Sequence, residues 1–181
     1  LGLLHSLGIK DILLITTPRD KKLFKSLLGN GKDFKCNISY VVQHKPKGIA
    51  EAIKLSKKFF TSEKIILLLG DNFFYGNNIK EIITRGINSN KGSTLFTYEV
   101  NEPQRYGVLN IKNNKIINIV EKPKKPTSKK AIPGIYIYDK KSLKYVDRLK
   151  PSKRGELEIT DLNNMYLKKD DAEIVDFKNG I

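Results

Sequence analysis

Short apolar runs alternate along the chain with segments whose apolar residues recur every three to four positions. The apolar runs are typical of strands buried on both faces, and the three-to-four spacing is typical of helices that bury one face. The run of three leucines and two isoleucines at residues 65–69 is predicted to be the most buried strand. Strands are predicted at residues 11–16, 38–42, 65–69, 93–100 and 173–177, and helices at residues 20–28, 48–60, 79–87, 140–149 and 159–168.

The pattern changes to alternation over residues 106–138. Two short strands, 106–110 and 115–120, flank Asn113-Asn114 and predict a hairpin, and residues 131–138 predict one more strand. The strand–helix succession predicts an α/β fold with a three-layer open sheet, mixed but mostly parallel, and helices on both faces. The hairpin adds antiparallel edge strands, and the absence of any linker or repeat predicts a single domain over residues 1–181.

Composition narrows the class of protein. The 181 residues are 39% hydrophobic and 29% charged, which is typical of a soluble globular protein, and no apolar run reaches the ~20 residues of a membrane span. We therefore expect no membrane partner. Cys36 is the single cysteine, so no internal disulfide can form, and a cytoplasmic location fits. Neither histidine is near Cys36 in the sequence, which favours a packing role over a nucleophile.

The formal net charge of +15 raises the alternative of a nucleic-acid-binding module. The lysines are spread through every segment, and no stripe combines aromatic and basic residues in the way that single strands require. The sequence therefore predicts solvated lysine-rich faces and no nucleic-acid partner.

Polar residues follow several of the predicted strands. Asp71 comes directly after the most apolar run, at the edge where open α/β sheets bind their ligands. Mg²⁺ is commonly held by one or two carboxylates together with substrate phosphates, so Asp71 is a candidate metal ligand. An Asx turn that closes the strand is the alternative explanation.

The other candidates are also at segment ends. Gln43 can read a pyrimidine edge, and Gly48 lets a backbone approach a flat ligand, although both residue types are common in loops. Glu121 and Lys122 suit a sugar hydroxyl and a phosphate, or a surface ion pair. Arg154 can fork onto a phosphate, or it belongs to the approach to a helix.

Five short motifs resemble, in order and spacing, those of the sugar nucleotidylyltransferases, and the resemblance covers essentially the whole chain. The motifs are Leu69-Gly70-Asp71-Asn72-Phe73-Phe74-Tyr75-Gly76, Arg105-Tyr106-Gly107-Val108, Glu121-Lys122-Pro123, Gly134-Ile135-Tyr136 and Arg154-Gly155-Glu156-Leu157-Glu158-Ile159-Thr160-Asp161. The resemblance implies a Rossmann-like nucleotide-diphospho-sugar transferase fold. It also implies that a sugar-1-phosphate oxygen attacks the α-phosphorus of a nucleoside triphosphate and that pyrophosphate leaves.

The resemblance further implies roles for individual residues. Asp71 would bind Mg²⁺ and the nucleotide, and Gln43 and Gly48 would read the base. Lys122 and Arg154 would hold the sugar phosphate, and these two residues would act in catalysis together with Asp71. Residues lining the sugar-phosphate site would be Gly107, Glu121, Lys122, Tyr136 and Arg154. Within the family the motifs are most similar to members that use dTTP and glucose 1-phosphate, and the implied assembly is a homo-oligomer, usually a tetramer.

Two alternatives remain open at this stage. One is a family member that uses UTP or CTP with a related sugar phosphate. The other is a non-catalytic binding domain of the same fold, although the retained Asp71, Glu121, Lys122 and Arg154 disfavour it.

The resemblance also predicts that the 181 residues are a partial catalytic domain. The family's first strand and glycine-rich phosphate loop are expected before Leu1, and a second metal-binding aspartate is expected just after Asn179-Gly180-Ile181. We therefore expect the isolated 181-residue chain to make no nucleotide sugar. The expectation is tested by anion-exchange chromatography of the products. Conversion of dTTP and glucose 1-phosphate to dTDP-glucose by this chain alone would contradict it.

Overall fold

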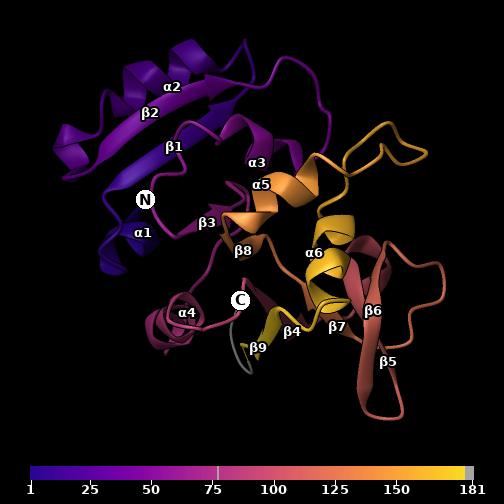
Figure 1. Cartoon of the computed structure of the whole chain (residues 1–181). Helices are drawn as coiled ribbons and strands as arrows, with labels where there is room; N and C mark the ends of the chain where they lie inside the picture. The colour runs from indigo at the N-terminus through magenta and orange to yellow at the C-terminus, as the bar shows by residue number, and fades with distance from the viewer. Residues whose placement is uncertain (77, 178–181) are drawn as a thin grey trace.

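Strands form two sheets in the computed structural model, which describes residues 1–76 and 78–177 (Figure 1). In the smaller sheet β1 (Asp11–Thr16) pairs in parallel with β2 (Asn37–Val42). The larger sheet has the order β3 (Lys64–Leu68), β8 (Ile135–Asp139), β4 (Ser93–Glu99), β7 (Lys130–Ile132), β5 (Gly107–Lys112) and β6 (Lys115–Glu121), with β9 (Ala172–Asp176) beside β4. Residues 179–181, invoked above for a second metal ligand, lie outside the described residues.

The prediction of a mostly parallel sheet is wrong. β8 lies between β3 and β4 and runs antiparallel to both, and β7 is antiparallel to β4 and β5. The predicted hairpin is confirmed as β5–β6. The parallel prediction assumed that each helix returns the chain to a neighbouring parallel strand. Instead the strand formed after the hairpin enters between two earlier strands, which local sequence does not reveal.

Helices cover both faces of the larger sheet, as predicted (Figure 1). One face packs against α3 (Glu51–Leu55), α5 (Lys141–Val146) and α6 (Ile159–Leu167). The other packs against α1 (Gly2–Ser6) and α4 (Ile79–Ile87). Because side chains alternate along a strand, Tyr136 and Tyr138 of β8 face the first layer while Ile135 and Ile137 face the second.

The remaining elements are short. α2 (Lys21–Leu28) lies against β2, and 3₁₀ turns occupy Lys32–Phe34 and Pro103–Arg105. Asp20 is at the predicted cap position of α2, but its carboxylate accepts hydrogen bonds from Thr17 and Arg19 rather than from a helix amide. No helix in the described part of the chain has the length and apolar character needed to cross a membrane.

Three predicted elements are clearly shorter than expected. The helix predicted at residues 140–149 is reduced to α5, Lys141–Val146. The helix predicted at residues 48–60 is reduced to α3, since Gly48 has a φ of 94° that no α-helix contains. The strand predicted at residues 131–138 is divided into β7 and β8 at Pro133-Gly134, because proline has no amide hydrogen to donate to a ladder.

The apolar run at residues 65–69 is half-buried rather than the most buried strand. β3 has one sheet neighbour, β8, among the described residues, and β1 likewise has only β2. The most buried positions are instead in β4 and β8, which have neighbours on both sides and helices above and below. Burial therefore follows the position of a strand in the sheet more closely than its own hydrophobicity.

Phe96 offers a direct test of this core. Its side chain is fully buried on the face covered by α4, and its ring stacks on Phe177 at 4.9 Å between centroids. We expect Phe96→Ala to lower the free energy of unfolding by about 3–5 kcal/mol in urea titrations of the protein at its full coded length. Leu27→Ala, at a side chain that is 69% exposed, is the control and should change it by less than about 0.5 kcal/mol. Equal effects of the two substitutions would refute the described packing.

Candidate active site

Three of the predicted site residues line one hollow of about 380 Å³. Glu121 is the last residue of β6, Lys122 follows it, and Arg154 lies on the loop between α5 and α6. Cations and carboxylates are mixed in this hollow, which suits a ligand that carries both a phosphate and hydroxyl groups. The other lining residues are Ser152, Lys153, Glu158 and Asp161.

The Arg154 guanidinium is held by Glu158. Its Nη2 donates to Glu158 Oε2 at 2.8 Å and its Nε donates to Oε1 at 3.2 Å, and Ser152 Oγ also donates to Oε1. Burial opposes ionisation of Glu158, but the hydrogen bonds from Arg154 and Ser152 outweigh it and lower the pKa of the carboxyl. The same hydrogen bond raises the pKa of Arg154. Both groups are therefore ionised, and the guanidinium has a fixed place at the hollow.

Lys122 has an unusual backbone. Its φ of 44° is in the left-handed region, which costs a residue with a side chain about 1–3 kcal/mol, and its N–H donates to the carbonyl of Tyr106 at 2.9 Å. The surrounding structure holds this conformation at the end of β6, where the chain turns past Glu121. Such strain is concentrated at functional sites, which supports a functional interpretation of Lys122.

Gly107 and Tyr136 lie beside Glu121. Gly107 faces Glu121 across the β5–β6 ladder, and a Cβ on Gly107 would lie 3.3 Å from Glu121 Oε2. That same carboxylate oxygen accepts a hydrogen bond from Thr160 Oγ1 at 2.5 Å. Burial, and then the charge of Glu121, raise the pKa of Tyr136, so its hydroxyl stays protonated. The predicted sugar-site residues thus surround one carboxylate.

Gln43 and Gly48 are also brought together. Gln43 Nε2 donates to Gly48 O at 3.3 Å and to Glu51 Oε2 at 2.6 Å. A Cβ on Gly48 would lie 2.3 Å from the carbonyl oxygen of Leu157, so glycine alone fits here. Leu157 N in turn donates to Lys47 O at 2.7 Å. The loop with the predicted base-reading residues therefore packs directly on the loop that carries Arg154.

Asp71 is exposed just beyond the end of β3. Its Oδ1 accepts a hydrogen bond from Asn72 Nδ2 at 2.7 Å, and Asn72 Oδ1 accepts one from Gly134 N at 3.0 Å. No cluster of three His, Cys, Asp or Glu side chains suitable for a metal occurs in the described residues. A single carboxylate with a free oxygen fits Mg²⁺ only if substrate phosphates complete the coordination shell.

Sequence reasoning missed residues that act on the site through another residue. Thr160 binds Glu121 across 39 positions of sequence, and Glu51 binds Gln43. Glu158 is part of the last of the five motifs, but that motif alone does not predict that it holds Arg154. The one local signal that could have found Glu51 is its position at the first residue of the helix after Gly48.

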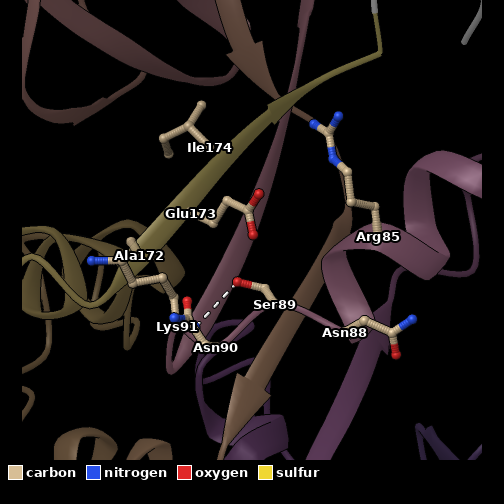
Figure 2. A pocket seen from close by; sticks show the side chains of 8 residues that line it. All are labelled: Arg85, Asn88, Ser89, Asn90, Lys91, Ala172, Glu173 and Ile174. Carbon is tan, nitrogen blue, oxygen red and sulfur yellow. Dashed lines mark hydrogen bonds between the residues drawn. The ribbon is translucent and has the colours of Figure 1, made fainter.

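A larger hollow, about 720 Å³, lies at the end of α4 and the start of β9 (Figure 2). No predicted site residue lines it. β3 and β4 are each antiparallel to β8 and so run in the same direction. Asp71 follows the carboxyl end of β3, whereas the hollow lies near the amino end of β4. The hollow and Asp71 are therefore at opposite ends of the strands. Its charges are mixed, since Arg85 and Lys91 are basic and Glu173 is acidic, and Lys91 already binds Asp170.

Comparison with known proteins places the chain among nucleotidyl transferases. The family model described as nucleotidyl transferase matches residues 1–180. A glucose-1-phosphate thymidylyltransferase of Neisseria meningitidis serogroup A is 44% identical over 92% of the chain and 58% of its own length. The enzyme of the same name from Xanthomonas campestris pv. campestris is 45% identical over 96% of the chain and 59% of its own length. The chain thus spans less than two thirds of these curated relatives.

Solved structures agree with this assignment. A crystal structure of a Bacillus anthracis protein in complex with sucrose is 40% identical to the chain, with a TM-score of 0.89. The match covers 99% of the chain and 72% of the Bacillus anthracis protein. A UDP-glucose pyrophosphorylase bound to UDP-glucose is 22% identical with a TM-score of 0.83 over 99% of the chain and 77% of its own, which shows a shared fold. From the family match and these relatives, the chain belongs to the nucleotidyl transferase family.

Proposed function

We propose that this chain forms part of the catalytic domain of a glucose-1-phosphate thymidylyltransferase, which makes dTDP-glucose and pyrophosphate from dTTP and glucose 1-phosphate. The main observation behind this proposal is that Glu121, Lys122 and Arg154 line one hollow. The loop that carries Arg154 contacts the loop of Gln43 and Gly48 through Leu157. Identity of 44–45% to relatives of that name supports the choice of nucleotide and sugar.

The reaction is a direct displacement at phosphorus. An oxygen of the glucose 1-phosphate forms a bond to the α-phosphorus of dTTP, the bond to the bridging oxygen breaks, and its electron pair leaves with pyrophosphate. The protein forms no covalent intermediate in this scheme. Its contribution is to hold the two reactants in line and to offset the negative charge that gathers where they meet.

The residues divide this work by their chemistry. Lys122 and Arg154 hold the sugar phosphate, because a fixed guanidinium and an ammonium suit a dianion. Glu121 accepts hydrogen bonds from sugar hydroxyls, and the protonated Tyr136 hydroxyl donates one. Gly107 has no side chain, so Thr160 Oγ1 and Glu121 Oε2 can lie close to its backbone, where a Cβ would be 3.0 Å and 3.3 Å from them.

The nucleotide side is read by other residues. Gln43 and the backbone of Gly48 contact the base, and Asp71 would hold Mg²⁺. The ion, when bound, neutralises phosphate charge and orients the triphosphate. The homo-oligomer implied by the family resemblance is part of this proposal for the whole protein.

Activity with a nucleotide panel tests the proposal. We expect the protein at its full coded length, with Mg²⁺ and glucose 1-phosphate, to prefer dTTP over UTP, CTP and ATP, measured by release of pyrophosphate. Arg154→Met and Asp71→Asn should each lower kcat/KM by about 100-fold or more, because each removes charge offset at the reacting phosphates.

Lys144→Met, on α5 and outside the hollow, is the matched control and should retain full activity. Preference for CTP or UTP would assign another nucleotidylyltransferase activity. Binding of dTTP without pyrophosphate release would instead indicate a non-catalytic binding domain.

Gly48 tests the packing of the base-reading loop. In Gly48→Ala the new methyl group would collide with the Leu157 carbonyl at 2.3 Å, so the loop must move away from the Arg154 loop. We expect the KM for dTTP to rise about tenfold or more and the melting temperature of the protein to fall as well. Gly8→Ala also places alanine at a positive φ, 74°, but meets nothing within 4 Å, so it should lower stability by about 1–2 kcal/mol and leave KM unchanged. An unchanged KM in Gly48→Ala would argue against this loop as the base site.

A further inference from the structure

The side-chain amide of Gln43 is held by two hydrogen-bond acceptors. Its Nε2 lies 2.6 Å from a carboxylate oxygen of Glu51 and 3.3 Å from the backbone carbonyl oxygen of Gly48. An ionised carboxylate and a carbonyl can only accept, so the NH₂ group, which supplies two donors, must face both of them. The reversed amide would bring three acceptor oxygens together. The orientation therefore follows from the partners themselves.

This arrangement determines what Gln43 can offer to a ligand. Both amide protons are used inside the protein, and the remaining group is the carbonyl oxygen Oε1, an acceptor. The backbone N–H of Gly48, the residue whose carbonyl accepts from Gln43, has no hydrogen-bond partner among the described residues and is a donor. Without Glu51 the amide could rotate, and Gln43 would present either a donor or an acceptor.

We propose that Glu51 is a positioning residue that sets the nucleotide specificity of the site by fixing the Gln43 amide with its carbonyl oxygen toward the base. The proposal rests on the proposed function and deepens it. An acceptor next to a donor complements an imide edge, in which N3–H lies beside a carbonyl oxygen, as in thymine and uracil. In the same register cytosine presents the lone pair of N3 to Gln43 Oε1, so two acceptors face each other.

The Glu51 side chain is mostly buried and contacts Gln43 directly. Its side chain is 16% exposed, and its two carboxylate oxygens have separate partners. Oε2 accepts from Gln43, while Oε1 lies 3.8 Å from the Lys47 ammonium. The Lys47 ammonium therefore contacts the carboxylate oxygen that does not bind Gln43.

Nuclear magnetic resonance of the nucleotide-free protein reads the Gln43 contact directly. We expect one Gln43 side-chain amide proton to be shifted downfield and to exchange slowly with solvent, because a charged acceptor at 2.6 Å makes a strong hydrogen bond. Glu51→Met, which removes both acceptor oxygens at similar size, should abolish both signatures. Glu51→Gln keeps one acceptor oxygen and should retain part of the shift.

Kinetics then read the consequence for specificity. In Glu51→Met the ratio of kcat/KM for dTTP to kcat/KM for CTP should fall about tenfold, mainly through a higher KM for dTTP. Glu51→Gln should keep most of the ratio of the parent protein. Lys54→Met is the matched control on the same helix; its ammonium contacts Asp147, and it should leave the ratio unchanged. A purely structural role of Glu51 would lower activity with both nucleotides equally.

The proposal is overturned if folded Glu51→Met keeps the ratio within twofold of the parent protein, or if its Gln43 amide signals match those of the parent. If Glu51→Met does not fold, Glu51→Gln signals identical to those of the parent overturn it as well. If the parent protein turns over no nucleotide at all, the proposed function is contradicted independently of the role of Glu51. The Gln43 signals still test the contact with Glu51 in that case.

Discussion

The contact between Gly48 and the backbone of Leu157 is the constraint on which the candidate site depends. The two chains meet so closely that a Cβ has no room, and Leu157 closes the contact with a hydrogen bond to Lys47 on one side and one from Ala50 on the other. Leu157 lies three residues after Arg154, so one short backbone pairing sets the distance between the loop proposed to read the base and the loop proposed to bind the sugar phosphate. Two reactants that must meet in line need such a fixed separation.

The larger sheet places the rest of the site through β8. This strand packs Tyr136 and Tyr138 on the layer of α3, α5 and α6, while its alternate residues face α1 and α4. Tyr136 thereby reaches the charge of Glu121 from a rigid, fully packed strand. The break at Pro133-Gly134 frees the Gly134 amide from the strand ladder. Gly134 N–H instead donates to the side chain of Asn72, the neighbour of Asp71.

Local pattern was sufficient to predict most elements, and α4 has the predicted bounds, because period and flanking residues are local properties. It failed for strand direction, because the insertion of β8 between β3 and β4 depends on pairings some 70 residues apart. Among the site residues, the polar groups at strand ends could be predicted from chemistry and from the family resemblance. Thr160 could not, since the Glu121 side chain that it orients lies 39 positions away in the sequence. Glu158 lies only four positions after Arg154, but both precede the helix predicted at residues 159–168, so no regular spacing predicted their contact.

The pairing of Arg154 with Glu158 does not remove its capacity to bind a phosphate. Glu158 occupies Nε and Nη2 of the guanidinium, and Nη1 has no hydrogen-bond partner among the described residues. A guanidinium has five N–H donors in a rigid plane, so fixing one side of the plane aims the other. Lys122, held in a left-handed backbone conformation, lines the same hollow. Glu158 thus orients Arg154, and a dianionic phosphate would meet a guanidinium already in place instead of ordering that long side chain itself.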